Sequence, residues 1–189
     1  IEHGTLGEES FTVQAKTYAK MFGLTRTDIV NDNLGAFNDI RNRLGRGAGL
    51  KLNHVFWTAF LDNVAFFTTA RGNCQDGGGS ALTDAGTALD AANLLFGALT
   101  DADGGPLGIV AKLLLVPPAL GAIARRLHVS GEIRDTTANT KYPTGNIWQN
   151  RFRPLESSYI STAAGGLDSS WYLLADPAEL PLMEVAFLN

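Results

Sequence analysis

The catalytic chemistry most easily imagined for this chain is that of a cysteine nucleophile, because it contains one thiol, Cys74, and histidines such as His54 and His128. A cysteine attacks as its thiolate, which a neighbouring imidazole generates by accepting the proton. Cys74, however, lies among glycines in a stretch typical of an exposed loop, and no local motif pairs it with either histidine. A hydrolase that uses Cys74 is therefore an alternative function that we do not favour.

Two glycine-containing motifs resemble functional loops only in part. The run Gly45–Gly49 has the glycine spacing of a phosphate-binding loop, but it lies inside a helical pattern and lacks the Lys-Ser or Lys-Thr ending of a P-loop. Ser80 follows three glycines, but it stands in no Gly-x-Ser-x-Gly motif and has no evident triad partner. Neither motif predicts a site.

Metal binding is equally poorly supported. His3, His54 and His128 are far apart in the sequence, and none is spaced with a glutamate as in helical zinc motifs. Asp101 and Asp103, followed by a glycine, resemble the opening of a calcium loop, but the later ligands are missing, so a plain turn is favoured. We therefore predict no catalytic, cofactor-binding or metal-binding residue and no cofactor.

The composition is that of an ordinary globular protein of 189 residues, with 45% hydrophobic and 18% charged residues. This length fits one domain or two small lobes. Glycine, proline or charge breaks every long apolar run, so we expect a soluble chain with no membrane partner. A single cysteine excludes an internal disulfide and agrees with folding in a reducing cytoplasm.

The charge distribution offers one local feature. A net charge of -4 gives no broad attraction for nucleic acid, but Arg41, Arg43, Arg46 and Lys51 form a basic cluster. Such clusters are usually solvated helix faces or subunit contacts. We expect this one to meet a neighbouring protein surface and leave weak, non-specific DNA contact open.

The first third of the sequence predicts a strand followed by an unusually long helix. Residues alternate in character from Phe11 to Ala19, which is the period of a strand with one covered face, and Leu24–Arg26 could return as a second short strand. Asn31–Asn33 can cap a helix that continues to about Asp62. At roughly 1.5 Å per residue this helix would be about 45 Å long. Its predicted apolar face comprises Leu34, Phe37, Ile40, Leu44, Ala48, Leu52, Val55, Phe56, Ala59 and Phe60.

Three glycines interrupt this helical pattern, at Gly45, Gly47 and Gly49. Each weakens a helix by roughly 1 kcal/mol relative to alanine. We therefore predict a kink, a break or a close backbone contact near Arg46.

The glycine-rich stretch from Arg71 to Ser80 predicts a flexible joint and a boundary between lobes. The polar stretch from Gly131 to Thr144 predicts a loop. The three tryptophans, Trp57, Trp148 and Trp171, are spaced as buried packing residues. The other predicted elements are a helix after Thr83 that reaches Leu99, a turn at Asp101–Pro106, a strand at Lys112–Val116, a helix after Pro118, and strands at Ile147–Ile160, Trp171–Ala175 and Leu182–Leu188. The predicted class is α+β.

Three blocks of this sequence resemble, in order and spacing, the major head (capsid) protein of Mu-like phages and prophages. They are Leu24–Phe37, Lys112–Pro118 and Trp171–Pro177, and the Arg71–Asn73 turn and the Leu89–Asp103 segment add to the likeness. The family commonly has Asp where this chain has Asn33 and Pro near Ala111. Because the family's chains extend beyond both ends of this one, we expect N- and C-terminal parts of the full protein to be missing.

The resemblance implies the Hong Kong 97-type phage capsid fold, an α+β tile. Residues 1–75 would form a peripheral lobe with a strand or hairpin and the long spine helix, and residues 76–189 an axial lobe of two helices and mixed strands, with the last strand returning to the first lobe. The implied function is that of a structural, non-enzymatic subunit. Copies would form pentamers and hexamers of an icosahedral head that encloses DNA, located in the virion and assembled in the bacterial cytoplasm. An encapsulin-like bacterial compartment subunit is the alternative within the structural class.

Overall fold

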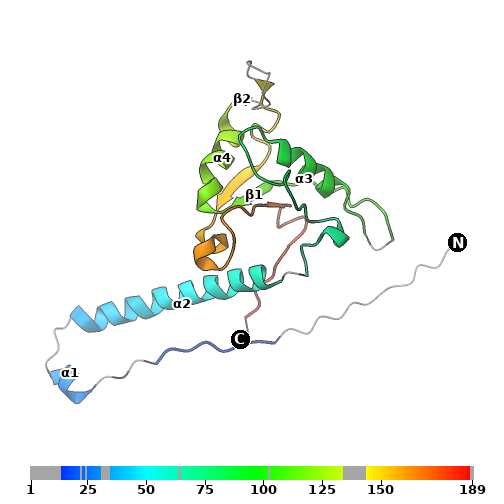
Figure 1. Cartoon of the computed structure of the whole chain (residues 1–189). Helices are drawn as coiled ribbons and strands as arrows, with labels where there is room; N and C mark the ends of the chain where they lie inside the picture. Colours follow the sequence, from blue (N-terminus) through cyan, green and yellow to red (C-terminus); the bar gives the residue numbers. More distant parts are fainter. Residues whose placement is uncertain are drawn as a thin grey trace. The chain divides into compact units, whose positions relative to one another are not determined.

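The computed structural model describes residues 14–21, 23, 25–30, 35–63, 65–101, 103–133 and 144–187. Helices and a small mixed sheet make up these residues, which confirms the predicted α+β class (Figure 1). The chain divides into a larger compact unit, Lys51–Glu184, and a second unit that holds the remainder. The predicted division into lobes at residues 75 and 76 stays a prediction. The elements are α1 (Arg26–Val30), α2 (Gly35–Asp62), η1 (Thr69–Arg71), α3 (Thr87–Gly97), β1 (Leu113–Val116), α4 (Pro118–Val129), β2 (Glu132–Ile133), β3 (Thr144–Gly145), β4 (Arg153–Glu156), η2 (Ser158–Ile160), η3 (Thr162–Ala164) and β5 (Tyr172–Leu174).

The long helix predicted from the sequence is present as α2, which has 28 residues and is therefore about 42 Å long at ~1.5 Å per residue. It is unbroken through its three glycines, so the predicted break near Arg46 is wrong (Figure 1). A close backbone contact is absent too, because a Cβ atom added at Gly45, Gly47 or Gly49 would meet no described atom within 4 Å. The glycines therefore lower the helix propensity of α2, but no described segment packs closely against its backbone at these positions. The predicted capping residues, Asn31–Asn33, lie outside the described residues.

The apolar positions of α2 do not form the single covered face that was predicted. Phe60 is buried and packs in a cluster with Trp57 and Leu61 partly buried beside it. Leu44 and Leu52 are exposed. Leu50 is exposed too, as is every other residue from Arg41 to His54, whichever way it points from the helix axis. Between Arg41 and His54 the helix is therefore open on every side, and its core contacts lie near its C-terminal end, around Phe60.

Two predicted strands are absent from the part of the chain that is described. Residues 14–19 of the predicted Phe11–Ala19 strand form no strand, and residues 11–13 lie outside the described part. Residues 182–187 of the predicted last strand likewise form none. Alternation makes a strand only where a neighbouring strand pairs with it, and no strand among the described residues pairs with either segment. The predicted short strand Leu24–Arg26 is also wrong where the structure describes it, because Thr25 is in no strand and helix α1 begins at Arg26, while Leu24 lies outside the described residues.

A three-stranded sheet organises the larger unit, with β1 in the centre, β4 parallel to it and β5 antiparallel to it. Leu114 and Val116 of β1 are almost fully buried. Pro118 occupies the first turn of α4, where the missing N–H of proline costs nothing, so the predicted strand–proline–helix order is confirmed. Strand β5 confirms the core of the predicted Trp171–Ala175 strand.

The remaining predictions hold in part. The helix expected after Thr83 begins later, at α3, because Gly86 adopts a left-handed conformation immediately before it. The predicted Ile147–Ile160 strand consists of a turn, the short strand β4 and the 3-10 turn η2. The predicted loop from Gly131 to Thr144 is wrong at its ends, where β2 and β3 pair antiparallel.

Two hydrophobic clusters form the core of the larger unit. The first joins α3, α4 and β1, with Leu89, Val116 and Trp148 buried and Trp171 packed at its margin. The second joins the C-terminal part of α2 to the sheet and includes Phe60, Leu115 and Ile160. The tryptophans therefore serve as packing residues, as predicted.

Candidate functional site

Cys74 is held in a chemically unreactive environment. Burial, and then the negative charge of Asp76, raise the pKa of its thiol above the ordinary 9.0. Tyr172 lies close enough for Cys74 to raise the pKa of its phenol, after the larger effect of burial. A nucleophilic cysteine needs the opposite shift, which a cation or a helix N-terminus provides. The surroundings of Cys74 therefore keep it protonated at neutral pH.

The other candidates for hydrolytic chemistry are dispersed. His54 is exposed on α2 and His128 is half-buried on α4, and within the described residues no hydrogen bond joins either imidazole to Cys74 or Ser80. The Ser80 hydroxyl donates to the carbonyl of Gly77 at 2.7 Å, and the Ser80 carbonyl accepts from the indole of Trp171. Ser80 is thus part of the loop structure. His3 lies outside the described residues.

The acidic turn predicted after α3 is confirmed as a turn. Asp101 Oδ1 accepts hydrogen bonds from the backbone N–H groups of Asp103 at 3.0 Å and Gly105 at 2.7 Å, and Thr100 pairs with Pro106 across the turn. The carboxylate that a calcium ion would need is thereby used to close the backbone. No group of three or more potential metal ligands occurs among the residues whose positions are described.

A small apolar recess lies beside the aromatic cluster of the larger unit. It is lined by Ala59, Phe60, Asn63, Phe66, Phe67, Leu182 and Met183. None of these side chains titrates near neutral pH, so the recess offers no acid or base for catalysis. The prediction that the chain has no catalytic, cofactor-binding or metal-binding residue stays a prediction.

The predicted basic cluster lies entirely on α2. Its four members, Arg41, Arg43, Arg46 and Lys51, are all exposed. Arg43 is held by Asp39 one turn earlier, with Nε 2.7 Å from Oδ2. At 100° per residue, Arg41 and Lys51 lie on one side of the helix and Arg46 on the other. The cluster is thus two charged faces, and exposed leucines lie on both, Leu44 and Leu52 on the first and Leu50 on the second.

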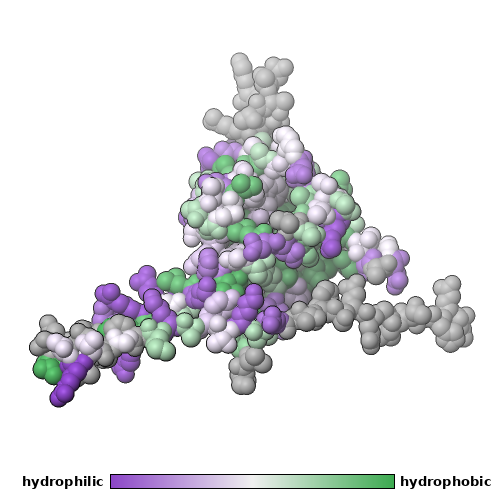
Figure 2. All heavy atoms as spheres, turned by 60° about the horizontal axis from the view of Figure 1, so that its bottom comes forward, coloured by the Kyte–Doolittle hydropathy of each residue, from purple (hydrophilic) through white to green (hydrophobic). Residues whose placement is uncertain are grey.

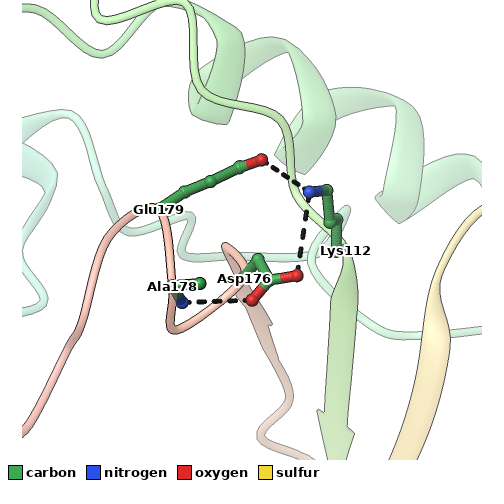
Figure 3. A network of polar contacts seen from close by, with 4 residues as sticks. All are labelled: Lys112, Asp176, Ala178 and Glu179. Carbon is green, nitrogen blue, oxygen red and sulfur yellow. Dashed lines mark hydrogen bonds and ion pairs between the residues drawn. The ribbon is translucent and has the colours of Figure 1, made fainter.

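Sequence reasoning missed a polar network that ties the end of the sheet together. Figure 3 shows the Lys112 Nζ atom between two carboxylates, 2.6 Å from Glu179 Oε1 and 3.7 Å from Asp176 Oδ2. Asp176 also accepts a hydrogen bond from the N–H of Ala178 at 3.1 Å. The hydrogen bond to Glu179 is the main cause of the raised pKa of Lys112. The Asp-Pro turn after β5 was visible in the sequence, but the contact between Lys112 and Glu179, 67 residues apart, was not.

The residues that could take part in catalysis or metal binding therefore do not come together in the described part of the chain. What this part offers is exposed surface. Within that part, no helix combines the length and apolarity needed to cross a bilayer. Comparison with known proteins gives one positive finding, a family model for a phage capsid protein that matches residues 8–189. No curated protein and no solved structure matches significantly. Because the family model spans nearly the whole chain, this protein belongs to that phage capsid protein family.

Proposed function

We propose that this protein is the major head subunit of a Mu-like prophage, and that its copies assemble into an icosahedral shell enclosing DNA. Membership of a phage capsid family gives it a structural role in the virion. The finer assignment is supported by the resemblance of Leu24–Phe37, Lys112–Pro118 and Trp171–Pro177 to Mu-like head proteins. Assembly would take place in the bacterial cytoplasm, with pentamers and hexamers as building blocks and without a cofactor.

The observation that carries this proposal is the exposure of α2 between Arg41 and His54. Every residue in this part of the 28-residue helix is exposed, including the three leucines Leu44, Leu50 and Leu52. Covering such apolar side chains with a partner would stabilise the contact by roughly 25 cal/mol for each Å² removed from water. A subunit that completes its burial against copies of itself would account for these exposed leucines.

The Hong Kong 97-type fold is part of the proposal. The long helix α2 would be the spine of a peripheral lobe at residues 1–75. Helices α3 and α4 with the β4–β1–β5 sheet would form the axial lobe at residues 76–189. An α+β class, a single long helix and a small mixed sheet are the features that support it.

Two alternatives make different predictions. An encapsulin-like compartment would form similar shells but package a protein cargo instead of DNA. A hydrolase using Cys74 is disfavoured, because burial and Asp76 raise the pKa of the thiol. It is disfavoured also because no described histidine is hydrogen-bonded to that thiol.

Electron microscopy of the full-length product, expressed alone and purified, tests the proposal. We expect closed shells of uniform diameter. Nuclease treatment followed by absorbance spectra and gel analysis of the contents separates a DNA-packaging head from a protein compartment. Persistent monomers or small oligomers across a range of concentration and salt would refute the shell-forming function, and shells that hold only a specific protein cargo would favour the encapsulin-like alternative.

A further inference from the structure

The chain that follows β5 lies on the surface of the larger unit without forming a strand. Residues 177–184, which we call the strap, are exposed except for Met183, which is half-buried. Two of them are prolines, which have no N–H group to donate. Beyond Leu180, no residue of the strap forms a backbone hydrogen bond with another described residue. Figure 1 shows the chain after β5 running from the sheet toward the C-terminal end of α2.

Two weak attachments hold the strap to the rest of the unit. Near its start, Glu179 Oε1 lies 2.6 Å from Lys112 Nζ, and Asp176 Oδ2, just before the strap, lies 3.7 Å from the same nitrogen (Figure 3). These three side chains are between 44% and 46% exposed, and exposed ion pairs stabilise a contact only weakly because solvent screens them. Near its end, Met183 packs against the cluster that contains Phe60 and forms part of the wall of the aromatic recess.

The other walls of the recess are held in place independently of the strap. One is the last turn of α2, where Phe60 is only 7% exposed. The next is the loop of Phe66 and Phe67, which Asn73 fixes by donating to the carbonyl of Phe66 at 2.8 Å and accepting from the N–H of Thr68 at 2.9 Å. The rings of Phe60 and Phe67 pack edge to face, with their centroids 5.8 Å apart. The strap is therefore the loosely held wall of a recess whose other walls are firm.

We propose that the strap opens locally about the turn that begins at Asp176, and that the ion pairs of Lys112 determine how often Met183 leaves the recess. Met183 follows Glu179 by four residues, which is at most about 14 Å of extended chain. Holding Glu179 therefore keeps Met183 at a high effective concentration beside the recess, and releasing it lengthens the free segment and lowers that concentration. Strand β5 stays paired with β1 during opening, because that pairing ends before the turn.

Opening would uncover the aromatic rings that the closed strap covers. Such local opening costs less free energy than unfolding of the unit, because few buried contacts are lost. Hydrophobic and hydrophilic residues are intermixed on the face that Figure 2 shows, so hydropathy alone marks no switchable surface there. The recess differs in that its exposure can change while the sheet and α2 stay folded. This device belongs to the single chain and does not depend on shell formation.

The two methionines of the chain provide a direct measure of opening. Met21 is 96% exposed, whereas Met183 is half-buried in the recess. Dilute hydrogen peroxide converts an accessible methionine thioether to the sulfoxide. The ratio of the two oxidation rates, measured by mass spectrometry of the peptides, therefore reports how often the strap opens. We expect Met183 to be oxidised several-fold more slowly than Met21 in the unassembled wild-type chain.

Substitutions at the ion pairs test the proposed control. Glu179→Gln removes the shorter ion pair and keeps the size of the side chain. We expect it to raise the oxidation rate of Met183 relative to Met21 by about 1.5-fold to 5-fold, the factor that the loss of an exposed ion pair gives. Lys112→Met should raise this ratio at least as much. Glu184→Gln is the matched control, because it removes the same charge from the strap at a residue that forms no described ion pair with Lys112, and it should leave the ratio unchanged.

Three results would overturn the proposal. Equal oxidation rates of the two methionines in the wild type would show that the strap does not cover Met183. An unchanged ratio in both Glu179→Gln and Lys112→Met would show that the ion pairs do not control opening. Protection of Met183 that is lost on dilution would show that the strap closes the recess of another copy.

Urea separates local opening from unfolding. The Met183 rate should depend on urea much less steeply than the unfolding transition does, since little surface is exposed, and an equally steep dependence would show that only unfolding exposes this residue. Because all rates are measured on the unassembled chain, a negative result leaves the shell-forming function standing. Failure to form shells likewise leaves the strap standing.

Discussion

Substituting Gly86 by alanine should be among the most damaging single changes in the larger unit. Gly86 precedes α3 with φ 68° and ψ 12°, a left-handed conformation that costs an L-residue roughly 1–2 kcal/mol. A Cβ atom there would lie 2.8 Å from Trp148 Cδ1 and 3.0 Å from Trp148 Nε1. Since Trp148 is only 5% exposed and stacks on Phe152, the indole has little room to retreat.

The size of the effect follows from adding these two penalties. Forcing extra atoms into a packed core typically costs about 1–3 kcal/mol. Together with the conformational cost, we expect Gly86→Ala to lower the free energy of unfolding by about 2–5 kcal/mol. Against a typical stability of about 5–15 kcal/mol, this is a large fraction.

The chain supplies a matched control for the conformational part. Gly72 has the same backbone angles, φ 68° and ψ 12°, but a Cβ atom added there would meet nothing within 4 Å. Urea denaturation followed by tryptophan fluorescence should therefore show a loss of only about 1–2 kcal/mol for Gly72→Ala. If Gly86→Ala lowers the free energy of unfolding by no more than Gly72→Ala does, then Trp148 does not pack closely against the start of α3.

Three further predictions concern polar groups. Replacing Lys112 by methionine should lower stability at neutral pH. The difference in stability from wild type should vanish as pH rises past the ordinary lysine pKa of 10.5 and through the raised pKa of Lys112, because stability from a raised lysine pKa exists only while the amine is charged. Urea titrations of both proteins at pH 7 and above pH 11 measure this, and a difference that is the same at both pH values would show that the contact with Glu179 contributes nothing. Cys74→Ala should leave the protein concentration needed for assembly unchanged. The wild-type thiol should be alkylated slowly at pH 7, with a rate that rises only toward and beyond pH 9.0. Rapid alkylation at neutral pH would contradict the protonated state of the thiol. Asn146→Ala removes two 2.7 Å hydrogen bonds to carbonyls at the end of α4 and one accepted from the Trp148 N–H, and should cost about 2–4 kcal/mol at roughly 1 kcal/mol each. Asn146→Asp keeps the acceptor for Trp148 but turns a carboxylate oxygen toward the two carbonyls, so it should cost at least as much as Asn146→Ala at pH 7 and less at pH 3, where the protonated carboxyl can donate to one of them. Urea titrations at the two pH values measure this, and a smaller loss than Asn146→Ala at pH 7 would contradict the donor role.

Local rules in the sequence were sufficient for the elements whose partners lie nearby. The apolar run before two prolines predicted β1 and the start of α4, because proline ends a strand and suits a first helical turn. The length of α2 followed from periodicity alone. The Asp101 turn followed from residues that bond within five positions of one another.

The failures share a different cause. Residues 14–19 and 182–187 have the alternation of strands, but a strand exists only when a second one is hydrogen-bonded to it, and alternation does not name that partner. The apolar positions of α2 were assigned to one face, although Leu44 and Phe60 fall on opposite sides once the drift of a 3.6-residue period is followed over several turns.

The sequence by itself determined the α+β class, the long helix, the proline-bounded strand and the likeness to a phage head protein, since each is written in contiguous residues. Tertiary structure alone decided which part of α2 is buried, that the pKa of Cys74 rises, and that Lys112 contacts Glu179. Those outcomes depend on distances between segments that are remote in the chain, and burial, Coulomb interaction and hydrogen bonding all act through space.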